Sequence, residues 1–118
     1  WSLLSLVGNK ERDHMRLKNP NSTGLIHLFR TAVFKDLGGY NEEFIGWGYE
    51  DEEIVIRFEK LNHPKQMLAD YTAFHLNHPR KMGDSIQVFK NYYRYLAVKN
   101  MPPEEILDYV KSWSLFSR

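Results

Sequence analysis

Four consecutive acidic residues stand between a glycine-rich aromatic turn and an apolar helical pattern, in the stretch GWGYEDEE at residues 46–53. Apolar residues then recur at the spacing of one helical face: Ile54, Val55, Phe58 and Leu61. This pattern predicts a helix beginning at Glu50 or Asp51. Acids in a first turn gain about 0.3–1 kcal/mol each from the helix dipole. That effect explains one or two acids better than four, because neighbouring like charges repel, so the stretch also indicates a functional site.

The remaining patterns predict an α/β fold with few strands. Apolar runs of strand length lie within residues 24–29 and 66–75. Helices are predicted after Thr31, which can cap a first turn, after Ser85, and after a pair of prolines at 102–103. The Gly38-Gly39 pair is expected to end the first of them. The helix after Ser85 carries one apolar face: Ile86, Phe89, Tyr93 and Leu96.

Two or three strands make a poor sheet by themselves. We therefore expect residues 1–118 to be a single domain that forms the C-terminal part of a longer α/β protein, with the other strands before residue 1. A core at residues 24–80 is followed by a helical tail at residues 84–118.

Composition narrows the class of protein. The chain is 42% hydrophobic and 26% charged with a net charge of +1, which is typical of a soluble globular domain and gives no support to nucleic-acid binding. It has no cysteine, so disulfides and thiolate metal sites are excluded, and a cytoplasmic location is expected. The apolar start of the chain is too short to span a bilayer, which needs about 20 residues. Association with a membrane surface stays open.

Asp51 is the first candidate for chemistry. A carboxylate where a loop enters a helix can point into a cleft and accept a proton from a hydroxyl, which is the general-base role. Glu50 could do the same or bind an acceptor sugar, and the alternative for either acid is a structural helix cap. The two other acids, Glu52 and Glu53, are expected to be solvated or to pair with basic residues further along the helix. Those residues are Arg57 and Lys60.

Trp47 lies between Gly46 and Gly48. Flanking glycines let the backbone pass close to a ligand and leave both indole faces free. A flat apolar face stacks on the C–H face of a sugar ring, whereas the alternative is a buried core tryptophan.

Two histidines lie at the end of the predicted strand at residues 66–75 and shortly after it: His75 and His78. Neutral imidazole is a common metal ligand, but one histidine alone does not hold a metal. The alternative is a hydrogen-bonded loop histidine. Arg80 follows closely and could neutralise a phosphate, or belong to a solvated basic loop.

Together these residues resemble a known family. The segments FRTAVF at 29–34, LGGYNEEF at 37–44 and GWGYEDEE at 46–53 resemble the C-terminal half of inverting GT-A fold glycosyltransferases. The most similar members are the β-1,4-galactosyltransferases and family-two relatives of the chondroitin-polymerase type. The resemblance covers residues 24–80.

The resemblance implies roles for individual residues. Asp51 would be the catalytic base, while Trp47, Gly48 and Glu50 would bind the acceptor. His75 or His78 would be a ligand of Mn²⁺ or another divalent cation, and Arg80 would lie near the diphosphate. The family's Asp-x-Asp metal motif is not in this chain. The resemblance therefore implies that the nucleotide-binding half and the other metal ligands lie outside it.

The function implied is metal-dependent, inverting transfer of a hexose or N-acetylhexosamine from a UDP-sugar to a carbohydrate hydroxyl, with this chain as the acceptor-binding half and inactive alone. One alternative is a non-catalytic carbohydrate-binding module that uses Trp47 and the acids as contacts. Another is an interaction domain whose aromatic helices dock a partner through Tyr92, Tyr95 and Trp113.

Overall fold

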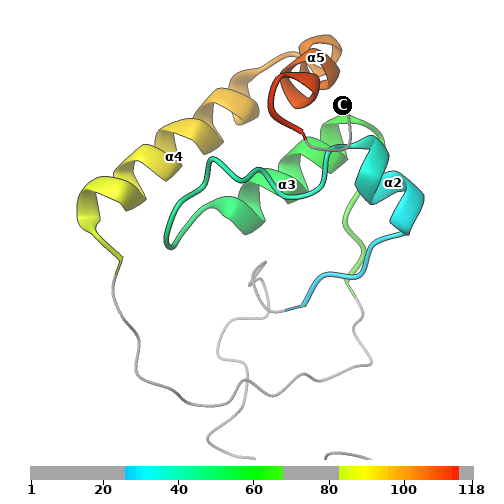
Figure 1. Cartoon of the computed structure of the whole chain (residues 1–118). Helices are drawn as coiled ribbons and strands as arrows, with labels where there is room; N and C mark the ends of the chain where they lie inside the picture. The colour runs from blue at the N-terminus through cyan, green and yellow to red at the C-terminus, as the bar shows by residue number, and fades with distance from the viewer. Residues whose placement is uncertain (1–25, 68–82, 115–118) are drawn as a thin grey trace, which may run out of the picture.

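The computed structural model describes residues 26–67 and 83–114, and over these ranges the chain folds into helices joined by turns (Figure 1). The helices are α2 at Thr31–Asp36, α3 at Glu50–Lys60, α4 at Ser85–Asn100 and α5 at Pro103–Trp113. Helices α3 and α4 pack along each other. The end of α5 packs on the turn after α2 and on the second half of α3.

The predicted α/β fold is wrong for the part of the chain that the structure describes, because residues 26–67 and 83–114 contain helices and no strand. Residues 26–30 do alternate in exposure as a strand would, with Ile26 and Leu28 outward and His27 and Phe29 turned inward. A strand also needs a neighbour that completes its hydrogen-bond ladder, and no described segment provides one. The second predicted strand, at 66–75, enters the described residues only at 66 and 67, which are not strand.

The helix ends follow the sequence closely. Helix α3 begins at Glu50, as predicted, and ends at Lys60, with Leu61 as its C-cap and Asn62 in the left-handed region. Helix α4 begins after Asp84, whose carboxylate accepts a hydrogen bond from the Ile86 backbone N–H at 3.0 Å. One detail differs for α2: its N-cap is Arg30, without a side-chain hydrogen bond, and not Thr31.

An apolar core joins α2 to α3. Leu37, Ile54 and Phe58 are buried, and partly buried side chains pack around them: Phe29, Val33, Phe34, Val55 and Leu61. The helical face predicted for α3 is therefore confirmed. A second apolar group, Val98 on α4 with Ile106 and Val110 on α5, is also removed from solvent.

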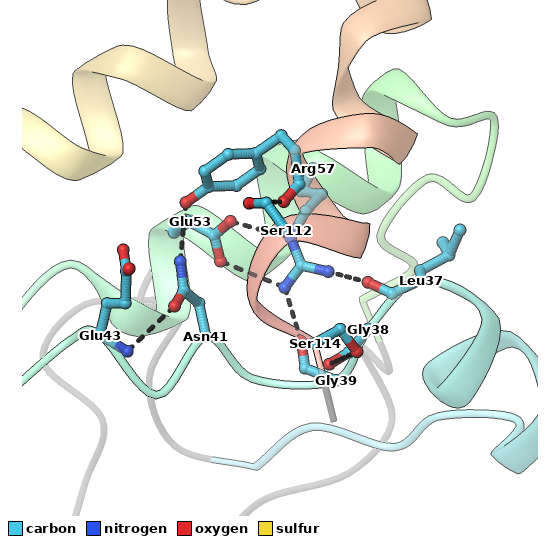
Figure 2. A network of polar contacts seen from close by, with 10 residues as sticks. Leu37, Gly38, Gly39, Asn41, Glu43, Glu53, Arg57, Ser112 and Ser114 are labelled. Atoms are coloured by element: carbon cyan, nitrogen blue, oxygen red, sulfur yellow. Dashed lines mark hydrogen bonds and ion pairs between the residues drawn. The ribbon is translucent and has the colours of Figure 1, made fainter. Parts of the chain in front are cut away.

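Beside this core lies a buried ion pair that links α3 to the preceding turn (Figure 2). The guanidinium of Arg57 donates to the Glu53 carboxylate at 2.8 Å and to the backbone carbonyls of Leu37 and Gly39. Both charged side chains are fully buried. Burial raises the pKa of the Glu53 carboxyl, and Arg57 opposes that rise. The sequence predicted that Glu53 is solvated or pairs with Arg57. The pairing is confirmed, and the solvated alternative is wrong.

Helix α4 turns a different side inward from the one its apolar residues indicated. Ile86, Phe89 and Tyr93 are more than half exposed, whereas Asn91 and Val98 are fully buried. Rings of Tyr92 and Tyr95 contact Tyr49 instead, with centroids 5.1 and 5.7 Å away. The buried side of α4 is thus the side that faces the loop before α3. The backbone carbonyls of that loop need a polar partner, which Asn91 provides. Within the residues described, no helix has the length and apolar character to cross a bilayer.

Candidate functional site

The candidate base, Asp51, lies in the first turn of α3. Tyr49 precedes the helix in the left-handed conformation, with φ of 72°, and its side chain makes no capping hydrogen bond. The Asp51 side chain is 27% exposed, so it is partly sheltered and still reachable from solvent. Such a position suits a carboxylate that exchanges protons with a ligand.

Two side chains from earlier in the chain meet this carboxylate. His27 Nδ1 lies 3.8 Å from Asp51 Oδ1 and 2.8 Å from the Tyr40 hydroxyl oxygen. The Tyr40 hydroxyl also interacts with the Asp51 carboxylate and favours its ionised form. His27 comes from the extended residues 26–30 and Tyr40 from the turn after α2, so three separate segments converge here.

Burial raises the pKa of the Asp51 carboxyl, and the neighbouring carboxylates of Glu50 and Glu52 add to the rise, while His27 and the Tyr40 hydrogen bond oppose it. Burial also raises the pKa of the Tyr40 hydroxyl, with Asp51 and Glu50 contributing, so this hydroxyl stays neutral and can donate. A carboxyl whose pKa is raised by folding loses stabilisation as the pH rises through the raised value. A carboxyl that is perturbed in this way and still reachable from solvent is a candidate for a functional role.

Trp47 projects from the loop that leads into α3. It is 65% exposed, so the core alternative is wrong and its indole can contact a ligand. Gly46 and Gly48 both have left-handed backbone angles, with φ of 77° and 107°. L-residues rarely adopt this conformation, and the two glycines thus let the chain turn sharply on both sides of the indole.

The same loop is tied down at two points. Asn41 Nδ2 donates to the Tyr109 hydroxyl of α5 at 2.7 Å, and its Oδ1 accepts from the Glu43 backbone N–H at 3.0 Å. Burial and the nearby carboxylates raise the pKa of Tyr109 to about 12. From α4, the fully buried Asn91 donates to the Ile45 carbonyl oxygen at 3.1 Å. Its Nδ2 also lies 3.5 Å from the Trp47 carbonyl oxygen, so the position of the indole depends on α4.

Asn91→Ala is expected to lower the free energy of unfolding by about 1–3 kcal/mol, since it removes a fully buried amide that donates a hydrogen bond to the Ile45 carbonyl. Denaturant unfolding measures the loss, and the indole N–H signal of Trp47 in NMR should move. Asn100→Ala, at the exposed end of the same helix, is the matched control and should stay within about 0.5 kcal/mol of the unchanged protein. Equal stability of the two variants would contradict the anchoring role.

The other predicted site residues lie outside the described residues: His75, His78 and Arg80. The structure therefore does not test their assignment to metal and diphosphate. Among residues 26–67 and 83–114, no group of three or more His, Cys, Asp or Glu side chains could hold a metal ion. A shallow open depression on α4 contains none of the predicted site residues; it is lined by Phe89, Lys90, Tyr93, Arg94 and Ala97.

Sequence reasoning placed Asp51, Glu50 and Trp47 on neighbouring positions of one loop and helix start, and the structure agrees. One Glu50 carboxylate oxygen is buried without a hydrogen-bond partner among the described residues. Sequence reasoning missed His27 and Tyr40 beside Asp51, and Asn91 behind the loop. The inward alternation of His27 and Phe29 was a usable signal, whereas nothing in the sequence of α4 marks Asn91.

A family model described as the N-terminal domain of galactosyltransferase matches residues 7–79. This is more than half of the 118 residues, and the chain belongs to this galactosyltransferase family. The family indicates glycosyl transfer as the class of activity. The resemblance is confirmed at the family level and now includes residues 7–23. The description names an N-terminal domain, so it gives no support to our assignment to a C-terminal half. No curated protein and no solved structure shows significant similarity to the chain.

Proposed function

We propose that this protein takes part in inverting transfer of a hexose or N-acetylhexosamine from a UDP-sugar to a carbohydrate hydroxyl, with Asp51 as the base. The observation that carries the proposal is the family match, because residues 7–79 include the whole loop and helix start around Asp51. By this reasoning, the acceptor that supplies the hydroxyl is a carbohydrate, as a polymer or a glycan.

The chemistry proposed for Asp51 is removal of the proton from the acceptor hydroxyl as its oxygen attacks the anomeric carbon of the donor. Partial exposure of the carboxylate supports access to such a hydroxyl. The neighbouring Glu50, which is partly buried, would accept a hydrogen bond from another acceptor hydroxyl through its carboxylate. A base held in a fixed position also keeps the acceptor hydroxyl in line with the anomeric carbon of the donor. Such positioning is a large part of the catalysis of these transfers.

Trp47 is proposed to bind the acceptor ring. Its exposed indole and the left-handed glycines on both sides support a stacking surface at the edge of the site. Because Asn91 fixes the backbone of this loop, the indole would be held in place before the sugar arrives. Preorganisation of this kind lowers the entropy lost on binding.

The proposal includes a divalent cation, with Mn²⁺ as the first choice and His75 or His78 as one ligand. Imidazole nitrogen suits such an ion. When bound, it would supply Lewis-acid stabilisation of the departing diphosphate. Arg80 would add a positive charge near the same group.

Asp51→Asn is expected to lower the turnover number about 10²–10⁴-fold, because the amide cannot accept the proton. Transfer is measured in the enzyme that contains this chain together with a nucleotide-binding half, with Mn²⁺, a panel of UDP-hexoses and UDP-N-acetylhexosamines, and saccharide acceptors. Glu52→Gln, an exposed acid on the next position, is the matched control and should retain activity within about twofold. Circular dichroism checks that both variants keep their helices.

Unchanged turnover in Asp51→Asn would refute the assignment of the base. Tight binding of oligosaccharides without Mn²⁺ or UDP, together with no transfer from any donor, would instead favour the non-catalytic carbohydrate-binding module. In that case Trp47→Ala should abolish binding, whereas Asp51→Asn should weaken it only slightly.

A further inference from the structure

The side chains of His27, Tyr40 and Asp51 form a connected polar group at the start of α3. His27 Nδ1 is 2.8 Å from the Tyr40 oxygen, and the same nitrogen is 3.8 Å from Asp51 Oδ1. The Tyr40 hydroxyl also interacts with the Asp51 carboxylate. The His27 side chain is 14% exposed, so solvent screens these contacts only in part.

The hydrogen bonds in this group have a direction set by the carboxylate. An ionised Asp51 accepts hydrogen bonds and donates none, so in its interaction with Asp51 the Tyr40 hydroxyl is the donor. The Tyr40 oxygen is then left to accept, and His27 Nδ1 must carry the hydrogen that it receives. In this chain, from His27 Nδ1–H to Tyr40 O–H to the Asp51 carboxylate, each donor points toward the carboxylate, which favours its ionised form.

We propose that His27 and Tyr40 are positioning residues that fix the orientation of the Asp51 carboxylate and hold it in the ionised form that a base requires. The proposal deepens the assignment of Asp51 as the base and rests on it for its catalytic meaning. Among the described residues, the titratable groups that act on Asp51 are the carboxylates of Glu50 and Glu52, on α3, the ring of His27 and the Tyr40 hydroxyl. The two carboxylates disfavour ionisation, and the His27–Tyr40 pair counteracts them.

The rings of this pair are themselves held in place by the core. His27 packs edge-on against Phe29 at 5.7 Å between centroids, and Tyr40 packs edge-on against Phe34 at 6.1 Å. Phe29 in turn contacts Phe58 of α3. A change confined to the Tyr40 hydroxyl should therefore leave the ring where it is.

Carbon NMR of the Asp51 carboxyl across a pH titration tests the proposal without any need for substrate. Tyr40→Phe should raise the pKa of Asp51 by about one pH unit, because a hydrogen bond to the charged form is lost. His27→Gln should raise it as well, since the ring that lowers the pKa of Asp51 is removed. Tyr93→Phe, which removes an exposed hydroxyl from α4, is the control and should leave the Asp51 titration unchanged.

An Asp51 titration that stays in place in both folded variants would overturn the proposal. Should Tyr40→Phe fail to keep the fold, His27→Gln decides the outcome alone. In the active enzyme, the acidic limb of the pH profile of kcat/KM should move upward by the same amount in each variant, which a merely structural role would not produce. If Asp51→Asn keeps full turnover, the base assignment fails, while the NMR result still decides whether the pair controls Asp51.

Discussion

Replacing Arg57 with methionine is expected to lower the free energy of unfolding by about 3–5 kcal/mol, which is the usual cost of breaking a buried ion pair. The Arg57 guanidinium satisfies the Glu53 carboxylate and the carbonyl oxygens of Leu37 and Gly39. It also lies over the ring of Trp113, 5.2 Å from the centroid, so one side chain links α3, the turn after α2, and α5. Methionine fills much of the space and removes every one of these donors.

Urea unfolding followed by circular dichroism measures the loss. Arg94→Met is the matched control, because Arg94 is partly exposed and its ion pair with Glu43, at 3.7 Å, lies near the surface. That variant should differ from the unchanged protein by about 0–1 kcal/mol. A loss in Arg57→Met no larger than in Arg94→Met would contradict the role given to the buried pair.

A double variant separates the cost of the pair from the cost of the carbonyls. Glu53→Leu with Arg57→Met removes both charges, so it should be less destabilising than the sum of the two single changes. It should still be less stable than the unchanged protein, because the Leu37 and Gly39 carbonyls remain buried without a donor. Gly39 precedes Tyr40, so both Arg57 variants should also disturb the hydrogen bond to Asp51.

The helices were the part of the fold that the sequence predicted best, for a local reason. The acids before Ile54, the prolines at 102–103 and the glycines after Leu37 act within one or two turns of the chain, and each sets a helix end where it was expected. Of the strand predicted at 24–29, the described residues 26–29 are not strand, because a strand is defined by its neighbour and not by its own residues. Its alternation in exposure was real, and it brought His27 inward to the site.

The candidate site was predictable only along one stretch of chain. Trp47, Glu50 and Asp51 are neighbours in sequence, so their proximity needed no knowledge of the fold. His27, Tyr40 and Asn91 reach the same loop from segments that tertiary packing alone brings together. Glu53 shows the same limit of local reasoning. Its spacing to Arg57 indicated an ion pair, but only tertiary packing explains why α5 and the turn after α2 bury that pair.

Gly38→Ala is expected to lower the free energy of unfolding by about 2–5 kcal/mol, from left-handed backbone strain and overpacking together. Gly38 has φ of 87°, which disfavours any residue with a side chain. A Cβ atom there would also lie 2.5 Å from Val110 Cγ1 and 3.2 Å from the Trp113 ring, both on α5. Helix α5 would have to move away from the turn, and the Ser114 hydroxyl would lose its contact with the Gly38 carbonyl.

Gly46→Ala isolates the backbone contribution, because Gly46 has a similar φ of 77° but a Cβ atom would meet only Gln87 Cγ, at 3.8 Å. This control should lose about 1–2 kcal/mol, from strain alone. The difference between the two variants in thermal or urea unfolding then measures how tightly α5 packs on the turn. Equal losses would show that α5 is not held against Gly38. A larger loss for Gly38→Ala would establish that α5 braces the turn that carries Tyr40 toward Asp51.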